Sequence, residues 1–394
     1  MRILFSLLFG GLFAAVSAQT VSNKPGSSYE FTKVAETQKT SVKDQCKTAT
    51  CWSFSTLSML EAELIRLGKG TYDFSEMYIA RWAYVEKAKM FIRLNGKHQF
   101  DQGGEGHDIP LIIQKYGLVP ESVYSGLLNG KTKHNHAELI EVLQAYMGTL
   151  AKKDPTTLSN EWVKGLEGIL DAYLGAVPSE FEYNGKKYTP LSFYQSLNIN
   201  LDDYVFLTSF THHPYYKSFP IEVPDNWAMQ SAYNVPLDEF METLKFSLKE
   251  GYSIAWAADV SEKGFAFRDG IAIVPIHDSL IQKKGTDNKQ FNDAGAVKIS
   301  TAFERPCAEF VATEAQRQEA FDLQKTTDDH GMHITGLFRE KNGTDFFEVK
   351  NSWGSANPCS GYLFVSENYI RYKTISVMVH KNGIPKNIRK KLGW

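Results

Sequence analysis

The sequence is poor in cysteine, with four residues of this type among 394. Cys46, Cys51, Cys307 and Cys359 are too few for the disulfide framework that holds many small secreted domains together. If one of the four is a free reactive thiol, three remain, and at most one intramolecular bridge can form. The length of the chain instead predicts two or three units of structure around cores of their own.

Long apolar runs are also missing, apart from one at the N-terminus. This run, residues 3–16, follows Arg2 and contains 14 residues, fewer than the roughly 20 that span a bilayer. It closes on the small residues Val16-Ser17-Ala18, which predicts a cleavable secretory signal over residues 1–18 with Gln19 as the first mature residue. A buried N-terminal helix is the alternative. We therefore expect an exported protein, periplasmic or secreted, without a membrane anchor.

An excess of charge of one sign is absent as well. The formal net charge is −2, and acids and bases are interspersed along the chain, so the bulk charge gives no sign of binding to nucleic acid or to an anionic membrane. The one basic segment, residues 386–391, is interpreted as a solvated helical face, with a partner site as the alternative.

Hydrophobic periodicity divides the chain into two parts. Apolar residues recur at helical spacing before Gly251, whereas β-type segments follow it. Helices are predicted over 52–67, 75–95, 108–116, 134–151, 157–175 and 237–248, and strands over 252–258, 332–338, 346–350, 361–365 and 374–380. This pattern is typical of an α+β protein with two halves that meet in a cleft.

Cys51 lies at the junction of a polar loop and a predicted helix. The first turn of a helix has unpaired N–H groups and the positive end of the helix dipole, which lower the pKa of a thiol placed there. Gln45 lies on the same loop, and its amide could stabilise, together with the Cys51 N–H, the oxyanion of a tetrahedral intermediate. The alternative for Cys51 alone is an inert buried thiol.

His330 and Asn351 supply the partners that a nucleophilic thiol requires. His330 opens one predicted strand, Asn351 follows the next, and the turn Lys341-Asn342-Gly343 pairs the two strands. The Asn351 oxygen can then fix the tautomer of His330, and Trp353 can shield this hydrogen bond from water. His333 faces the other side of the strand, because side chains three positions apart on a strand point in opposite directions.

Other patterns carry less weight. Residues 126–132 have one residue too few between their glycines for a phosphate-binding loop. The pairs His98/His107, His134/His136 and His212/His213 show no acidic or thiolate partner at ligand spacing. The sequence therefore predicts no metal and no cofactor.

The segments Gln45–Phe54, Asp329–Met332 and Asn351–Gly354 resemble the three signature blocks of papain-like cysteine peptidases. The resemblance implies Cys51 as nucleophile, His330 as base, Asn351 as orienting residue and Gln45 as oxyanion donor. It also implies that Gly103 and Gly104 bind substrate through their backbone, for which glycine is suited because no Cβ blocks the approach of a peptide. The implied fold is a two-lobed papain-like fold, with a helical lobe and an antiparallel β lobe.

Several further segments, among them 75–96, 104–120 and 239–259, are similar to the bleomycin hydrolase and aminopeptidase C branch of that family. This resemblance implies a large helical insertion, a peptide or protein substrate and a homo-oligomer, a hexamer in many members. The predicted organisation is a signal at 1–18, an arm at 19–41, a helical lobe with the nucleophile at 42–130, a helical insertion at 131–250 and a β-rich lobe at 251–394.

The C-terminus leads us to expect a different type of peptidase from the members of that branch. Members of the branch are aminopeptidases because a C-terminal tail blocks the non-primed side of the cleft, whereas this sequence stops at Gly393-Trp394. We therefore expect an endopeptidase. The alternatives are an aminopeptidase of the bleomycin hydrolase type and an inactive peptide-binding protein on the same fold.

Overall fold

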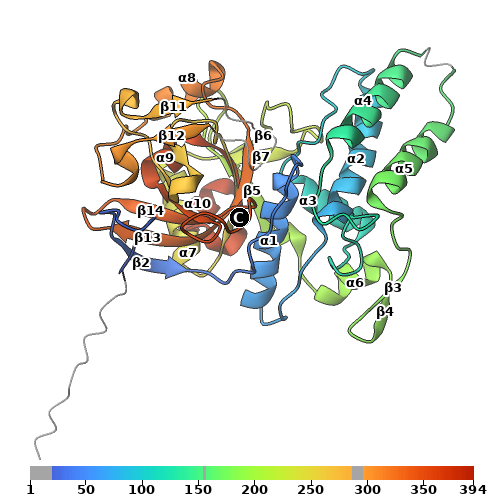
Figure 1. The fold of residues 1–394 in the computed structure, drawn as a ribbon, viewed down its shortest axis with the longest axis horizontal. Coiled ribbons are helices and arrows are strands. Elements are labelled where there is room, and N and C mark those ends of the chain that lie inside the picture. The colour runs from blue at the N-terminus through green and yellow to red at the C-terminus, as the bar shows by residue number, and fades with distance from the viewer. Residues whose placement is uncertain (1–19, 154–156, 286–295) are drawn as a thin grey trace, which may run out of the picture.

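The computed structural model describes residues 20–153, 157–285 and 296–394. Figure 1 shows a helical lobe beside a lobe built around a large sheet, with helix α1 (Cys51–Arg66) at the junction between them. This arrangement is the α+β fold expected from the sequence. The predicted signal, residues 1–18, lies outside the described residues.

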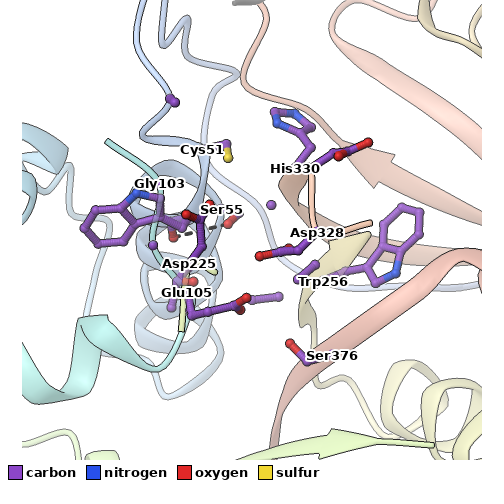
Figure 2. Close-up of a pocket in the computed structure, with 18 of the residues that line it drawn as sticks. Cys51, Ser55, Gly103, Glu105, Asp225, Trp256, Asp328, His330 and Ser376 are labelled. Atoms are coloured by element: carbon purple, nitrogen blue, oxygen red, sulfur yellow. Dashed lines mark hydrogen bonds between the residues drawn. The ribbon is translucent and has the colours of Figure 1, made fainter. Parts of the chain in front are cut away.

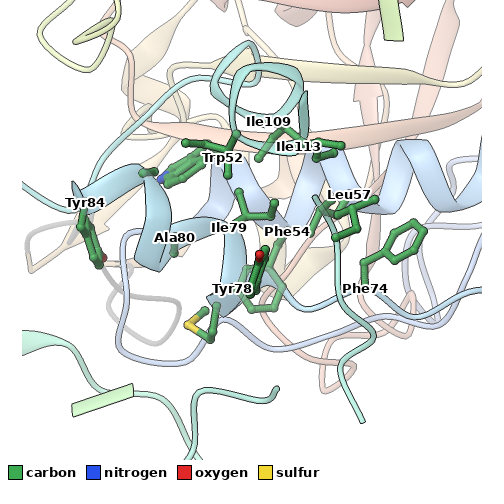
Figure 3. Packing of buried hydrophobic residues seen from close by; sticks show 14 of the residues in the cluster. Trp52, Phe54, Leu57, Phe74, Tyr78, Ile79, Ala80, Tyr84, Ile109 and Ile113 are labelled. Atoms are coloured by element: carbon green, nitrogen blue, oxygen red, sulfur yellow. The ribbon is translucent and has the colours of Figure 1, made fainter. Parts of the chain in front are cut away.

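The helical lobe packs around α1 and its neighbours, and Figure 3 shows part of this core. Helices α1 to α5 begin and end within a few residues of their predicted positions, whereas helix α6 was not predicted. Helix α2 starts after Ser75, whose side chain accepts a hydrogen bond from the Tyr78 N–H at 3.0 Å and so caps the helix. Gly117 ends α3 with a positive φ of 80°. The helices after α1 are α2 (Glu76–Arg93), α3 (Asp108–Tyr116), α4 (Ala137–Ala151), α5 (Glu161–Leu174) and α6 (Pro190–Leu197).

The β lobe contains one sheet whose main path runs β6-β7-β5-β16-β8-β13-β14-β15-β10-β9. Its longest strand, β13 (His330–Glu340), pairs with β14 on one edge and with β8 and β2 in succession on the other. The other strands of the sheet are β1 (Thr20–Val21), β2 (Phe31–Glu36), β5 (Tyr204–Thr208), β6 (Ser218–Pro220), β7 (Ser231–Asn234), β8 (Ile254–Ala258), β9 (Phe265–Ala266), β10 (Ile271–Ala272), β14 (Asp345–Lys350), β15 (Tyr362–Ser366) and β16 (Thr374–His380).

The described residues also form four further α-helices, two small hairpins and several short 3-10 helices. The helices are α7 (Leu237–Lys249), α8 (Glu314–Asp322), α9 (Glu367–Lys373) and α10 (Lys386–Leu392). The hairpins are formed by β3 (Phe181–Tyr183) with β4 (Lys186–Tyr188), and by β11 (Gln282–Lys284) with β12 (Val297–Ile299). No helix in the described ranges is long and apolar enough to pass through a lipid bilayer.

Two segments differ from their predicted form. The arm contains a regular strand, because β2 pairs antiparallel with the second half of β13. The segment 131–250 is not wholly helical, since β5, β6 and β7 lie within it and extend the main sheet beyond β16. Short strands of three to five residues offer too little alternation to be recognised, and only pairing with distant strands stabilises them.

Candidate active site

A cavity of about 170 Å³ lies where the two lobes meet. Figure 2 shows its walls: Cys51, Gly103 and Glu105 come from the helical lobe, whereas His330 and Trp256 come from the β lobe. The structure therefore confirms the cleft between the two halves. It also brings Cys51 and His330, far apart in the sequence, to one cavity.

Close packing at Gly331 holds His330, the predicted base, beside Cys51, the predicted nucleophile. A Cβ atom on Gly331 would lie 2.7 Å from Ser55 Oγ and 3.3 Å from the backbone carbon of Cys51. The start of β13 therefore rests directly on the first turn of α1, and the Gly331 N–H donates a hydrogen bond to the Cys51 sulfur. This contact fixes His330, the preceding residue, next to the thiol.

His330 is oriented by Asn351. The His330 Nε2 atom lies 2.8 Å from Asn351 Oδ1, and the Ser352 N–H donates to the same oxygen at 2.7 Å. Because that second bond identifies the acceptor as the amide oxygen, His330 Nε2 must carry the proton. In the neutral ring the Nδ1 atom then has a free lone pair, which can take the proton of Cys51.

Trp353 covers this pair as expected. Its ring centroid lies 4.6 Å from that of His330 at an interplanar angle of 34°. His330 itself is only 3% exposed. A buried hydrogen bond under an aromatic ring exchanges little with water, so the orientation of the base is preserved.

The protonation of the pair differs from the expectation for a thiol at a helix start. Burial raises the pKa of the Cys51 thiol to about 12, with Asp328 and Asp225 adding to the rise. Burial likewise lowers the pKa of His330 to about 4. The predicted lowering of the thiol pKa is therefore wrong, since loss of water outweighs the helix dipole. Both shifts disfavour the charged form of the group that is buried.

Gln45 occupies the loop that leads to Cys51 and is 2% exposed. Its Nε2 atom donates to the Thr48 carbonyl at 2.7 Å, and its Oε1 atom accepts from Ser352 Oγ at the same distance. These bonds connect the nucleophile loop to the residue after Asn351. One of the two amide hydrogens is engaged in this way, and the role of Gln45 as oxyanion donor stays a prediction.

Gly103 and Gly104 line the cavity, and neither position has room for a side chain. A Cβ on Gly103 would lie 1.9 Å from Asp225 Oδ2, and one on Gly104 would lie 2.9 Å from the Trp52 ring. Lys87 Nζ donates to the carbonyls of Asp101 and Gly103. Thus the loop that carries the two glycines is held rigidly beside Cys51.

His333 stands apart from this cavity, as predicted. Its Nδ1 atom lies 3.0 Å from Ser58 Oγ of α1, and its side chain is fully buried. Met332 and Ile334, the neighbours of His333 along β13, belong instead to the core of the β lobe. The alternation of the strand thus gives the two histidines different surroundings.

Carboxyl groups in the cavity were not predicted from the sequence. Glu105, Asp225 and Asp328 all line it, and Figure 2 shows Glu105 and Asp328 pointing toward one another. The pKa of Glu105 is raised well above its ordinary value, first by burial and then by Asp328 and Asp225. Glu105 directly follows Gly104, and Asp328 lies two residues before His330, so their closeness to predicted site residues is a usable signal. The sequence around Asp225 gives no such signal.

One group of side chains contradicts the analysis of the histidine pairs. Glu222 Oε2 lies 3.1 Å from His212 Nε2, and Glu222 Oε1 lies 2.8 Å from His213 Nε2. The histidines therefore do have an acidic partner, which a loop and strand β6 bring to them. The sequence spacing of nine and ten residues gave no indication of this contact.

Comparison with known proteins adds to this geometry. Residues 92–303 and 285–393 match the Peptidase C1-like family. Aminopeptidase G of Lactobacillus delbrueckii subsp. lactis is 25% identical over 392 residues, covering 88% of this chain and 82% of that protein. Aminopeptidase C of Listeria monocytogenes is also 25% identical, over 432 residues, with 97% and 89% covered.

The fold has a solved counterpart. The crystal structure of PepW from Lactobacillus rhamnosis HN001 superimposes with a TM-score of 0.68 at 20% identity, covering 92% of this chain and 84% of that one. Its likeness supports the papain-like architecture of the two lobes.

Proposed function

The chain belongs to the Peptidase C1-like family and is a cysteine-type peptidase, and from this premise we propose that it is an aminopeptidase. Relatives that match most of its length are named as aminopeptidases. They favour the alternative reading of the sequence over the expected endopeptidase. The observation that carries the proposal is the set of carboxyl groups beside Cys51.

The chemistry at Cys51 follows from the geometry of the pair. His330 Nδ1 accepts the thiol proton as the sulfur attacks the scissile carbonyl carbon, and the imidazolium then donates it to the departing amine. Water, deprotonated by the same nitrogen, hydrolyses the thioester and restores the thiol. Asn351 keeps Nε2 protonated throughout, so that Nδ1 alone faces the reaction.

The carboxyl groups give the cavity one sign of charge. Among its described lining residues there are five acids and no lysine or arginine. One oxygen of Glu105, Oε1, is buried and has no hydrogen-bond partner. Burial, and then repulsion from neighbouring acids, holds the pKa values of Glu105 and Asp225 above their ordinary range. A substrate ammonium group would reduce the repulsion between the acids, because its positive charge attracts the carboxylates. It would also donate a hydrogen bond to the unpartnered oxygen of Glu105.

The position of these acids suits a free N-terminus. A peptide lying along Gly103 and Gly104, with its scissile carbonyl at Cys51, directs its preceding atoms into this cavity. The α-ammonium group of an N-terminal residue then meets Glu105 and Asp328. None of the described residues beyond Met378 lines the cavity, and Trp394 packs instead against Tyr233 at a centroid distance of 4.7 Å. The negative charge at the site thus comes from side chains of the cleft.

Paired substrates test the proposal. The same fluorogenic peptide is offered with a free and with an acetylated N-terminus, and the products are followed by mass spectrometry. Loss of a buried charge pair costs roughly 2–5 kcal/mol, so we expect kcat/KM to be about 30-fold to 5,000-fold lower for the acetylated peptide. We also expect residues to be released one at a time from the free peptide. Equal cleavage of both, at internal bonds, would refute the proposal and support an endopeptidase.

Substitutions then assign the discrimination to the cavity. Glu105→Gln and Asp328→Asn should each reduce the preference for the free peptide, mainly through KM. The exposed Glu319 offers a matched control, since its side chain is 64% exposed. Glu319→Gln should leave the preference unchanged.

We also propose that the protein is exported. The support is the pattern of residues 1–18, in which Arg2 precedes an apolar run and small residues. Expression of the full chain in a bacterial host, followed by fractionation and N-terminal sequencing, should find a mature protein beginning at Gln19 outside the cytoplasm. An unprocessed cytoplasmic product would refute export and leave the proposed activity untouched.

A further inference from the structure

A second group of chemically capable side chains lies outside the active site. His212 and His213 follow β5, and Glu222 comes two residues after β6. One nitrogen from each histidine and one carboxylate oxygen of Glu222 lie within 4.8 Å of one another. Two imidazole nitrogens and one carboxylate form a donor set typical of zinc sites.

The tautomer of His212 can be worked out from its neighbours. The Thr211 N–H donates to Gln318 Oε1 at 2.6 Å, and Gln318 Nε2 donates to Asp322 Oδ1 at 2.8 Å. These bonds fix which end of the Gln318 amide is the oxygen. Because His212 Nδ1 lies 3.1 Å from that oxygen, Nδ1 must be the protonated nitrogen.

The consequence appears at the other ring nitrogen. In a neutral His212 the Nε2 atom carries a lone pair, yet it faces a carboxylate oxygen of Glu222 at 3.1 Å. Two acceptors at this distance repel each other unless a cation or an extra proton lies between them. A single divalent cation also satisfies His213 Nε2, which lies 2.8 Å from the other oxygen of the same carboxylate.

The rings are held in place before any ion binds. His213 stacks on Phe219 at a centroid distance of 4.0 Å and an interplanar angle of 24°, and His212 packs edge-on against the same ring at 5.4 Å. Gln318, on α8, fixes the rotation of His212 from behind. Histidines that bind metals commonly make such contacts with residues that are not themselves ligands. These contacts fix the tautomer of the ring and the direction in which its free nitrogen points.

We propose that His212, His213 and Glu222 bind one Zn²⁺ ion, with a solvent-facing fourth position. Half-exposed side chains of this kind leave room for water on the metal. The ion would connect the loop after β5 to the segment after β6. Its three ligands lie in the sequence between Phe206 and Asp225, and both of these residues line the active-site cavity. The role is therefore a structural tie, and it does not depend on the proposed aminopeptidase activity.

Zinc binding is measured on the full chain carrying Cys51→Ala, so that the catalytic thiol cannot act as a ligand. Competition against a chromophoric chelator should give one Zn²⁺ per chain. His213→Gln and Glu222→Gln, which keep the size of the side chains, should each weaken binding at least about 10-fold. His277→Gln alters an exposed histidine elsewhere and should leave the affinity unchanged.

A second readout is thermal unfolding. Zn²⁺ should raise the unfolding midpoint of the Cys51→Ala chain, because a ligand that binds only the folded state stabilises it, and this rise should disappear in His213→Gln. Absence of zinc binding would overturn the proposal. So would binding that is equally tight in His213→Gln and Glu222→Gln, since the ion would then be bound at another site.

Discussion

The hydrogen bond between His330 and Asn351 allows a direct test of the catalytic pair. Asn351→Asp keeps an oxygen acceptor at the same place but adds a negative charge next to the ring, 2.8 Å from Nε2. At about 4 Å between charge centres and an effective dielectric constant of about 20, the attraction to an imidazolium is about 4 kcal/mol. Desolvation of the new carboxylate offsets part of this, so we expect the His330 pKa to rise by roughly 1–3.

The sign of the effect on activity follows from the role of the base. His330 must be neutral to accept the thiol proton, and its pKa in the native protein is lowered to about 4 by burial. A higher pKa protonates the base earlier as the pH falls. The acid limb of kcat/KM should therefore move upward in Asn351→Asp, with activity near pH 8 much less affected than activity near pH 5.

The assay is a pH profile of kcat/KM on a peptide with a free N-terminus, between about pH 3.5 and 8. Asn351→Ala provides the opposite perturbation: it removes the acceptor, frees the ring, and should lower kcat by about 10² or more at every pH. Asn342→Asp, in an exposed turn, controls for the added charge. An unshifted acid limb in Asn351→Asp, or wild-type turnover in Asn351→Ala, would refute the assignment of His330 as a neutral base held by Asn351.

Four further predictions follow from the same structure. Cys51→Ala should abolish hydrolysis without unfolding the protein, and an iodoacetamide label that inactivates the enzyme should map to Cys51 by mass spectrometry. His333→Ala should lower the unfolding midpoint but change kcat only a few-fold, because the ring is buried against α1 away from the cavity; a large kcat loss in a folded variant would contradict this. Gln45→Ala should reduce turnover about 10²–10³-fold while alkylation of the thiol is nearly unaffected; equal losses in both would assign Gln45 to the loop alone. Burial raises the pKa of Asp108 to about 7, so its contribution to the free energy of unfolding is full below about pH 4 and is lost as the pH rises through 7. Urea unfolding of Asp108→Asn should therefore show a flatter pH dependence than the native protein. An unchanged dependence would argue against a protonated Asp108.

Much of the fold, and the meeting of the candidate site residues, could be predicted because the decisive patterns are local. Helices such as α2 and α3 carry their capping and ending residues within the element, at Ser75 and Gly117. Cys51, His330 and Asn351 each lie at the end of an element whose type is clear from its periodicity. The structure places these three residues where their positions in the sequence suggested.

The features that were not predicted depend on contacts between distant segments, and hydrophobic periodicity within one segment contains no information about such contacts. Strand β2 is stabilised by β13, and the short strand β5 pairs with β16. Asp225 reaches the cavity only because its carboxyl group packs on the backbone of Gly103. The same limitation explains why the expected thiol pKa was wrong, since burial is a property of the assembled lobes and not of a helix start.

The pairing of β2 with β13 has a consequence for the order in which the molecule forms. Thr37 Oγ1, at the end of this pairing, donates to the Thr335 carbonyl across 298 residues of chain. Closing so long a loop is slow, and local helices form well before it. The base on β13 thus reaches the thiol of α1 only once nearly the whole chain has been made and the lobes have joined. A chain in which α1 has formed but β13 has not yet docked would hold Cys51 without His330 beside it, and the proposed peptidase chemistry would be lacking until the lobes join.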